Sequence, residues 1–242
     1  MELKIFHKGF NYSQDGTGNR LVYHLQKCNL ICPWCANPEG MDAEGVDTFT
    51  MSVEEVVDEA ARSRAMFFDG GGVTFTGGEA TCQFQALKEV LIRLKAEGIS
   101  TALETNATAL RLPELFPYID ELIMDFKHYD SQVHKQIMGL GNETIIKNLK
   151  CASKEHTNVL VRIPLIGGVN ASEEDREAFI ELLKQYHNLN MRFELLCYHE
   201  YGKEKWAKCG KKYQVSDAFV SEDTRKAFES RMRAEGFYIV RT

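Results

Sequence analysis

Residues 27–37 read KCNLICPWCAN and set three cysteines, Cys28, Cys32 and Cys35, within eight positions. Gaps of three and then two residues put all three thiols on one short loop, where they can converge. Most structural metal–thiolate sites close at four protein ligands, so this loop raises the question of what fills the fourth position. The loop follows an apolar run, RLVYHLQ at residues 20–26, which predicts a buried strand leading directly into it.

Composition and charge indicate an ordinary globular protein. Hydrophobic residues make up 44% and charged residues 26% of the 242 positions, which is typical of a domain with a sizeable core. The chain has no run of about 18 apolar residues and begins with MELKIFHKGF, so we expect a cytoplasmic protein without a membrane span or secretion signal. The net charge of −6 argues against a nucleic-acid partner bound through a broad basic surface.

Seven cysteines in a chain without an export signal indicate reduced thiols. Outside the loop they are scattered, and we expect them to be small buried residues: Cys82, Cys151, Cys197 and Cys209.

Strand-like and helix-like segments alternate along the whole chain. Ser52 with Glu55 and Ser172 with Asp175 have the spacing of a helix capping box, and Gly98 is placed to end a helix. The expected strands are residues 20–26, 72–76, 100–105, 121–127, 158–165 and 191–198 with a short one at 237–240, and the expected helices are 52–68, 84–98, 112–118, 142–155, 172–187 and 223–235. About six strand–helix units in series predict a parallel sheet with helical crossovers. Because a complete barrel needs eight units, we expect an α/β fold that forms an incomplete (β/α)6 TIM-like barrel, with an open doubly wound sheet as the alternative.

Unusual polar residues recur where the expected strands end. The cysteines follow the first strand, Thr76–Glu79 ends the second and Glu104–Ala107 ends the third. Asp125–Lys127 ends the fourth, Arg162 lies late in the fifth and His199 follows the sixth. Because ligands of α/β folds bind at the carboxyl ends of the strands, these positions predict one shared site.

Several of these residues also have a plainer interpretation. Gly77–Gly78 fits a tight turn as well as a close approach of backbone to a ligand. Asp125 and Lys127 are two residues apart and share one strand face, so both charges would lie in the barrel interior, where they need a functional reason. His134 and His156 fall in helical segments, and we expect them to be ordinary surface residues.

Two kinds of metal site suit the clustered thiols. A structural zinc site would take His24 as its fourth ligand, but the sequence has no second CxxC pair and no HxxxH pair. An iron–sulfur cube held by three cysteines leaves one iron open to a small molecule. In that case the unfilled fourth position is where a substrate binds.

The order of motifs carries a family resemblance. CxxxCxxC with Trp34 before the last cysteine resembles the signature of the radical S-adenosylmethionine (SAM) superfamily. Between residues 10 and 214, six stretches resemble in order the glycyl-radical-enzyme activating enzymes, most closely the pyruvate formate-lyase activating branch: DGTGNRLVYHLQKCNLICPWCANPEG, GGGVTFTGGEATCQ, LETNATA, DFKHYDSQVHKQIMGLGNETIIKNL, VRIPLIGGVN and ELLCYHEYGKEKWAKCGKKY.

The resemblance implies a cofactor and the residues around it. Cys28, Cys32 and Cys35 would ligate one [4Fe-4S] cluster whose open iron takes the amino and carboxylate groups of SAM. The residues expected around SAM are Trp34, Ala36, Asn37, Gly77, Gly78, Glu79, Glu104, Asp125, Lys127, Arg162 and His199. Of these, Gly77, Gly78 and Glu79 would line the methionyl amine, while Lys127 and His199 would contact the carboxylate and nucleotide end. Glu104, Thr105 and Asp125 would hold a monovalent cation, Na⁺ or K⁺.

The function that the resemblance implies is activation of a glycyl radical enzyme in an anaerobic setting. Reductive cleavage of SAM at the cluster would yield a 5′-deoxyadenosyl radical, which takes a hydrogen atom from one glycine of the partner. We expect the chain to be a monomer whose electron donor is a flavodoxin or ferredoxin. The alternatives are a radical SAM enzyme acting on a small molecule or a ribosomal peptide, and a non-enzymatic zinc- or cluster-binding module.

The sequence departs from the pattern of this family at a few positions. Lys27 and Ala107 stand where glycine is common, Gly167 replaces a frequent proline, and Ala80 replaces a proline common elsewhere in the superfamily. Only seven residues separate CANPEG from TFTMS, where many related activating enzymes insert a ferredoxin-like segment. We therefore expect one radical SAM domain over residues 1–242, with a core at about 18–200, a C-terminal extension at 201–242, no inserted domain and one cluster.

Overall fold

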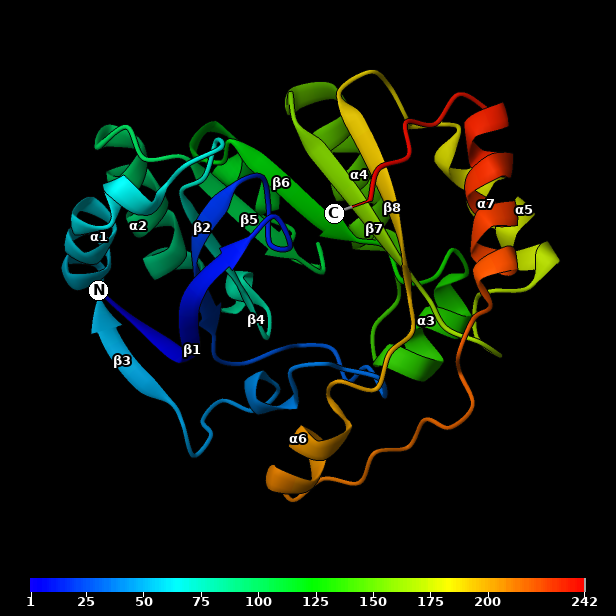
Figure 1. Ribbon diagram of the computed structural model, residues 1–242, viewed down its shortest axis with the longest axis horizontal. Coiled ribbons are helices and arrows are strands. Elements are labelled where there is room, and N and C mark those ends of the chain that lie inside the picture. Colours follow the sequence, from blue (N-terminus) through cyan, green and yellow to red (C-terminus); the bar gives the residue numbers. More distant parts are fainter. Residues whose placement is uncertain (242) are drawn as a thin grey trace. The chain divides into compact units, whose positions relative to one another are not determined.

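The computed structural model describes residues 1–241 and shows an α/β fold with an eight-stranded sheet (Figure 1). The strands are β1 (Glu2–Tyr12), β2 (Asn19–Leu25), β3 (Phe49–Ser52), β4 (Val73–Gly77), β5 (Thr101–Thr105), β6 (Glu121–Asp125), β7 (Val159–Leu165) and β8 (Met191–Cys197). The α-helices are α1 (Val53–Arg62), α2 (Phe84–Ala96), α3 (Ser131–Met138), α4 (Glu143–Glu155), α5 (Glu173–Leu183), α6 (Lys203–Lys208) and α7 (Glu222–Ala234). Four 3₁₀ helices complete the secondary structure: η1 (Pro38–Gly40), η2 (Arg64–Met66), η3 (Ala80–Gln83) and η4 (Leu112–Tyr118).

The sheet is mostly parallel and is not closed. Its order is β3-β1-β2-β4-β5-β6-β7-β8. β2 pairs in parallel with β4, β4 with β5, and β7 with β8, whereas β1 runs antiparallel to β2 and β3. The predicted α/β class with an incomplete parallel sheet is confirmed. Within residues 1–241, no helix is long and apolar enough to cross a membrane.

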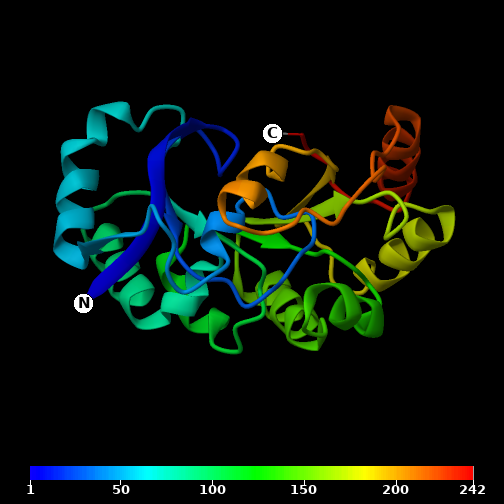
Figure 2. The same cartoon turned by 90° about the horizontal axis from the view of Figure 1, so that it is seen from below.

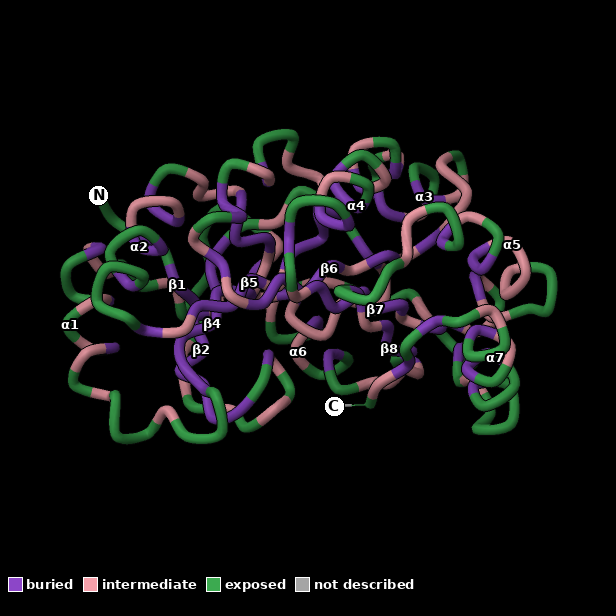
Figure 3. Tube along the Cα trace, turned by 90° about the horizontal axis from the view of Figure 1, so that it is seen from above, coloured by how far each residue is buried: buried purple, intermediate pink, exposed green. Residues whose placement is uncertain are grey.

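The chain divides into two compact units. The first comprises residues 1–29, 37–105 and 109–123, and the second comprises residues 30–36, 106–108 and those from 124 onward. In the first unit α1 and α2 pack against each other beside β1–β5 (Figure 1). The central strands β2, β4 and β5 are buried along most of their length (Figure 3), as expected of parallel strands covered on both faces.

An aromatic cluster forms part of the core of the second unit. Phe179 of α5 meets Phe126, just after β6, in an edge-to-face contact with ring centroids 5.7 Å apart. Phe228 of α7 lies 6.1 Å from the ring of Phe179. Each of these side chains is fully or almost fully buried, and edge-to-face pairs stabilise beyond the area they bury. This cluster attaches α5 and α7 to the sheet of the second unit.

The helix-start signals in the sequence are confirmed. Ser52 with Glu55 and Ser172 with Asp175 both form complete capping boxes, and Gly98 has the left-handed φ of +65° that follows many helices. Residues 112–118 form a 3₁₀ helix rather than an α-helix. Pro117 explains the difference, because a proline inside a helix cannot donate the backbone hydrogen bond of an α-helical turn.

The sequence analysis did not predict β1 and β3, and its prediction of a strand at residues 237–240 is wrong. In β1 the register shifts between Ile5 and His7, so Ile5 and Phe6 are both buried and the alternation that identifies a strand is interrupted. β3 has four residues and no fully buried one. Residues 237–240 form no strand, and only Ile239 makes an isolated bridge to Phe193.

The expectation that His134 and His156 lie on the surface is wrong. The side chains are 0% and 5% exposed. His134 Nδ1 bonds to the carbonyl of Leu140, while His156 Nδ1 accepts from the amide of Asn158. Both rings therefore pair with nearby backbone through Nδ1, while Nε2 of His134 is buried without a hydrogen-bond partner among residues 1–241.

At the amino ends of the strands in the first unit, one arginine is almost fully buried. Arg20 is 1% exposed; its Nε donates to Thr74 Oγ1 at 2.7 Å and its guanidinium also bonds to the carbonyls of Val73 and Ser100. Burial lowers the pKa of Arg20 to about 10, against the opposing charge of Glu121. The side chain stays charged at neutral pH and links the starts of β2 and β4 with the residue before β5.

We expect Arg20→Met to lower the free energy of unfolding by about 3–5 kcal/mol, because it leaves buried acceptors without a donor. Urea unfolding followed by circular dichroism measures this change. Arg93→Met is the control, since Arg93 pairs with Glu89 on the surface and such pairs contribute under about 1 kcal/mol. Equal midpoints for the two variants would contradict the structural role of Arg20.

Two non-glycine residues hold left-handed backbone conformations beside the strand ends. Lys27 has φ +81° and Ala107 has φ +57°. A side chain in this region meets its own backbone at a cost of about 1–2 kcal/mol. The resemblance implies glycine at these two positions, and the left-handed φ values give a physical reason to expect it there.

We expect Lys27→Gly to raise the free energy of unfolding by up to about 1 kcal/mol, since the relief of strain exceeds the entropy that glycine adds to the unfolded chain. Lys27→Ala, which removes the exposed side chain but keeps the strain, should stay within about 0.5 kcal/mol of the parent. Thermal and urea unfolding compare the three proteins. A glycine variant less stable than the alanine variant would show that φ is not strained here.

Candidate functional site

In the first unit, predicted site residues follow three neighbouring parallel strands. Register pairs Leu25 of β2 with Gly77 of β4, and Phe75 of β4 with Leu103 of β5. Cys28 follows β2, Gly77–Glu79 ends β4, and Glu104 and Thr105 end β5. The carboxyl ends of these strands therefore bring this part of the predicted set to one edge of the sheet.

Glu79 is the most buried acid at this edge. It is 1% exposed, and its Oε1 accepts from the amide of Thr81 at 3.0 Å, from the hydroxyl of Thr105 at 2.7 Å and from the hydroxyl of Thr81. Its backbone amide donates to the carbonyl of Lys27 at 2.8 Å. These donors fix the position of the Glu79 carboxyl group at the end of β4.

The charge of Glu79 affects a neighbouring thiol. Burial, and next the charge of Glu79, raise the pKa of Cys82 to about 11. That thiol stays protonated at neutral pH and is a poor nucleophile or metal ligand. Cys82 is only partly buried, as are Cys151, Cys197 and Cys209, so the expectation that these four cysteines are buried is wrong.

Gly77 and Gly78 are required by the packing of main chain against main chain. A Cβ on Gly77 would lie 2.3 Å from the amide nitrogen of Leu25, and one on Gly78 would lie 2.3 Å from the carbonyl of Gly40 and 2.4 Å from that of Lys27. The glycines thus let β4 end directly against the segment that leads into Cys28. This is a structural reason for both glycines beside the ligand-binding reason that the sequence suggested.

The expected cation ligands have other partners in the structure. Within the first unit Glu104 accepts from the hydroxyl of Thr76 at 3.1 Å, and Thr105 donates its hydroxyl to Glu79. The third residue, Asp125, belongs to the second unit, where it pairs with Lys127. The cation site stays a prediction.

In the second unit, one charged pair lies at the end of β6 and another lies in the middle of β7 and β8. Lys127 Nζ lies 2.6 Å from Asp125 Oδ2, with side-chain exposures of 12% and 25%. Arg162 Nε donates to Glu194 Oε2 at 2.9 Å, and this pair, opposite in register on β7 and β8, is almost fully buried. Each of the two predicted basic residues, Lys127 and Arg162, therefore forms an ion pair with a carboxylate.

Asn170 fixes the carboxyl ends of β6 and β7. Its side-chain amide donates to the carbonyls of Lys127 and Pro164 at 2.8 Å each, and its oxygen accepts from the amide of Ile166 at 2.7 Å. The side chain is fully buried. One residue thus joins the chain after β6 to the end of β7.

His199, two residues after β8, is partly buried beside an aromatic ring. Its ring stacks on that of Tyr201 with centroids 4.2 Å apart. Burial lowers the pKa of His199 below its usual value, so the imidazole is neutral at pH 7. A neutral ring can both donate and accept a hydrogen bond, which suits contact with the polar edge of a nucleotide.

The cysteine loop is held by backbone contacts on both sides of Leu30. In the first unit the amide of Cys28 donates to the carbonyl of Met41 at 3.1 Å. In the second unit the amide of Ile31 donates to Met138 at the end of α3, and Trp206 Nε1 of α6 donates to the carbonyl of Cys35 at 2.9 Å. The loop is therefore seated by the main chain and by one indole.

Trp34, expected beside the cofactor, also has a structural role. It packs against a core cluster formed by Ile166, Tyr198 and Ala218. Ala36 and Asn37, which follow Cys35, are partly buried. Ala36 contacts Gly202, because a Cβ on Gly202 would lie 2.9 Å from the Cα of Ala36. The role of these three residues toward SAM stays a prediction.

The three thiols of the loop fit an iron–sulfur cluster, although the side chains are not preorganised as a metal site. None of the seven cysteines forms a disulfide within residues 1–241, so the loop offers three thiol ligands. Among the same residues no three His, Cys, Asp or Glu side chains are grouped as a metal site. The ligand assignment therefore rests on the thiol chemistry and the CxxxCxxC spacing.

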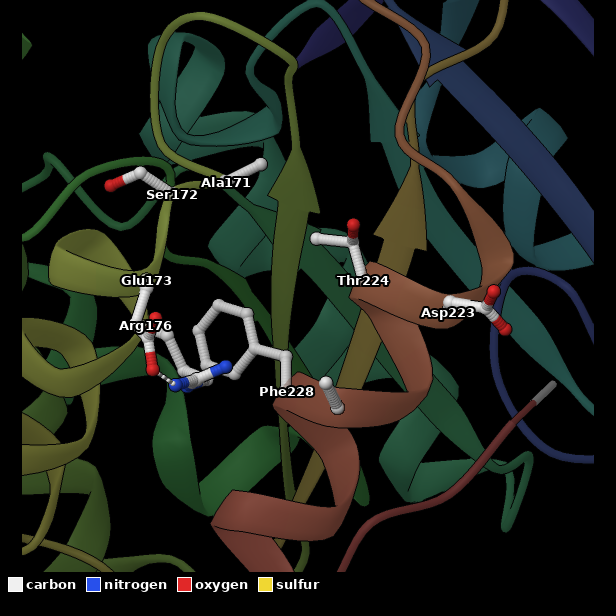
Figure 4. A pocket seen from close by; sticks show the side chains of 8 residues that line it. Ala171, Ser172, Glu173, Arg176, Asp223, Thr224 and Phe228 are labelled. Carbon is white, nitrogen blue, oxygen red and sulfur yellow. Dashed lines mark hydrogen bonds and ion pairs between the residues drawn. The ribbon is translucent and has the colours of Figure 1, made fainter.

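A pocket of about 370 Å³ lies elsewhere in the second unit, between the start of α5 and α7 (Figure 4). Arg176 and Phe228 line it, with Ser172 and Thr224 at its edge. Arg176 is held there by an ion pair with Glu173. None of the predicted site residues lines this pocket, so it is no part of the candidate site.

Sequence reasoning missed several residues that position the site. Glu194 carried a signal, since it is a single acid inside the apolar strand MRFELLC and alternation places it beside Arg162. Gly202 and Trp206 carried no periodic signal, because each acts through contact with backbone that is distant in sequence. Asn170 bonds to the distant Lys127 as well as to the nearby Pro164 and Ile166.

Comparison with known proteins identifies the family. The model of the radical SAM superfamily matches residues 22–183. The pyruvate formate-lyase 1-activating enzyme of Escherichia coli (strain K12) is 30% identical over 206 residues, covering 83% of this chain and 82% of that protein. The choline trimethylamine-lyase activating enzyme of Oleidesulfovibrio alaskensis is 28% identical over 263 residues, covering 83% and 85%.

A solved structure agrees with these sequence matches. The crystal structure of a domain of pyruvate-formate lyase-activating enzyme from Bacteroides vulgatus matches with a TM-score of 0.58 and 29% identity, covering 71% of this chain and 98% of that chain. This chain is a radical SAM enzyme and belongs to the family of glycyl-radical-enzyme activating enzymes.

Proposed function

We propose that this chain activates a glycyl radical enzyme by generating a radical on one glycine of that partner. The observation that carries the proposal is near-full-length similarity to activating enzymes whose partners differ, among them pyruvate formate-lyase and choline trimethylamine-lyase. The superfamily implies a [4Fe-4S] cluster and SAM, and these supply one-electron cleavage of SAM followed by hydrogen-atom abstraction.

The chain's own residues would bind and orient these groups. Cys28, Cys32 and Cys35 would hold three irons. Glu79, fixed by Thr81 and Thr105, suits a bound ammonium. Lys127, after β6, and Arg162, within β7, carry positive charge and suit a carboxylate.

The proposal needs no acid–base side chain. His199 is neutral at pH 7 because burial lowers its pKa, so its role would be to hold the nucleotide rather than to move a proton. Trp34 and Ala36 would exclude water from one side of the cofactor. A monovalent cation at Glu104, Thr105 and Asp125 belongs to the same proposal.

A single cluster is part of the proposal. The match to the O. alaskensis enzyme extends over 263 positions, whereas the match to the E. coli enzyme extends over 206, and both cover 83% of this chain. The longer relative therefore contains residues that have no counterpart here. This supports a chain without an inserted cluster-binding segment.

We expect anaerobic reconstitution to give about four irons per chain, and the EPR signal of the reduced cluster to change shape when SAM is added. Replacing Cys32 by Ser should remove most of the iron, because a cube with two protein ligands is poorly held. Cys151→Ser is the matched control and should retain it, since Cys151 lies on α4 and contacts Glu155. Zinc without sulfide in the parent protein would refute the cluster.

The activation itself is tested by mixing the reconstituted protein, SAM and dithionite with a panel of purified glycyl radical enzymes. We expect one partner to develop a glycyl radical doublet by EPR, and a deuterated glycine in that partner to transfer deuterium to 5′-deoxyadenosine. SAM cleavage that no partner stimulates, but that a small molecule or a peptide does, would favour the alternative radical SAM activities instead.

A further inference from the structure

One imidazole of the second unit is buried and takes no part in the candidate site. His134 of α3 is 0% exposed. Its Nδ1 bonds to the carbonyl of Leu140, two residues beyond the end of the helix. A carbonyl can only accept a hydrogen bond, so Nδ1 donates and carries the proton of the ring. Burial lowers the pKa of His134, and the ring is therefore neutral at pH 7.

The bond from His134 fixes the turn that ends α3. Gly139 leaves the helix with a left-handed φ of +91°, and its amide donates to the carbonyl of Lys135 at 3.0 Å. The chain reverses at this glycine, and the imidazole then holds the carbonyl of Leu140 against the helix. We call residues 138–140 the α3 turn.

The α3 turn holds one side of the cysteine loop. The amide of Ile31 donates to the carbonyl of Met138 at 3.1 Å. A Cβ on Gly139 would lie 3.4 Å from Cγ1 of Ile31, so this side chain lies against the turn. Ile31 is 65% exposed and gains little from burial there. The main-chain bond to Met138 therefore fixes the loop directly before Cys32.

The other side of the loop is held by a separate contact. Trp206 Nε1 of α6 donates to the carbonyl of Cys35 at 2.9 Å. Figure 2 shows α6, in orange, next to the blue stretch of chain that contains the loop. The loop from Ile31 to Cys35, the α3 turn and α6 all belong to the second unit. A change in the α3 turn therefore acts on Cys32 first, while Cys35 keeps its own hydrogen bond.

The second nitrogen of His134 argues against a role in stability alone. Nε2 is buried without a hydrogen-bond partner among residues 1–241. A desolvated acceptor without a partner opposes folding, so an apolar side chain of similar size would fill this part of the core without that penalty. An apolar side chain cannot, however, donate to Leu140. The imidazole therefore suits the task of fixing the α3 turn better than that of filling the core.

We propose that His134 is a positioning residue for the iron–sulfur cluster. Through Leu140 it fixes the α3 turn, and through Ile31 the turn fixes the backbone before Cys32. This rests on the proposed function, which supplies the cluster. A ligand that is held in place before the metal arrives binds more tightly, because less motion is lost on binding. His134 acts in this way without contact to the cluster or to SAM.

Three substitutions separate the donor of His134 from the volume of its ring. His134→Asn places an amide N–H near the position of Nδ1, whereas His134→Gln places it near that of Nε2, and His134→Leu has no donor. His156→Leu is the matched control. His156 is also a buried histidine of the second unit whose Nδ1 bonds to nearby backbone, but it follows α4 and its partner is Asn158.

The first readout needs no cluster. Hydrogen exchange of the full chain before reconstitution, followed by NMR, reports the protection of the Ile31 amide. We expect His134→Leu and His134→Gln to speed this exchange by about tenfold or more, because a bond that holds the turn is lost. His134→Asn and His156→Leu should change it by under about twofold. The amide of Cys28, which donates to Met41, should stay protected in all four variants.

The second readout is the retention of the cluster. After anaerobic reconstitution, absorbance measures the rate at which an iron chelator removes iron. We expect this rate to rise about tenfold or more in His134→Leu and His134→Gln. It should stay within about twofold of the parent in His134→Asn and His156→Leu. Rescue by His134→Asn would show that the donor to Leu140, rather than the volume of the ring, is required.

Three outcomes would overturn the proposal. The first is an Ile31 amide whose exchange does not respond to His134→Leu or His134→Gln. The second is a His134→Asn variant that behaves like His134→Gln or does not fold, and the third is an equal effect of His156→Leu, which would indicate general destabilisation. Failure of the proposed function is distinguishable from all three, because the parent would then hold no cluster while the exchange of Ile31 still depended on His134.

Discussion

Main chain packs directly on main chain where β4 ends, and the start of the cysteine loop depends on that contact. Gly78 donates its amide to Leu25 and Glu79 donates to Lys27, at separations that leave no space for a Cβ on Gly77 or Gly78. Lys27 holds a left-handed φ while its carbonyl accepts this bond. Backbone geometry therefore sets the approach to Cys28, and the side chain of Gln83 adds a hydrogen bond to the carbonyl of Gln26.

The later part of the same loop is fixed by a different set of contacts. Met138 at the end of α3 accepts from Ile31, and Trp206 of α6 donates to Cys35. Gly202 lies so close to Cys35 that no larger residue fits. A loop whose backbone is already ordered loses less conformational entropy when its thiols take up a cluster. The ordered backbone of the loop thus favours assembly of the cluster, even though the thiols are not preorganised as a metal site within residues 1–241.

The sequence predicted features that depend on local pattern. Both capping boxes, the strands β2 and β4–β8 and the fold class have signals confined to a few neighbouring residues. It failed where the cause is distant: His134 is buried because α3 turns back at Gly139 and Leu140, and the register shift in β1 hides its alternation. The candidate cysteines and strand-end acids could be named from spacing, whereas Trp206 and Gly202 act on Cys35, which is far along the chain.

Arg20 lies at the amino ends of the strands and Lys127 at the carboxyl end of β6, and the two side chains form different kinds of interaction. At the amino ends Arg20 donates to Thr74 and to backbone carbonyls. It could bind a ligand only by giving up these hydrogen bonds within the fold. At the carboxyl end of β6, Lys127 pairs with the carboxylate of Asp125. A ligand carboxylate can take the place of one such partner with no change in the charge around the ammonium. A paired but exchangeable lysine is therefore suited to binding, while a fully bonded arginine is suited to stability.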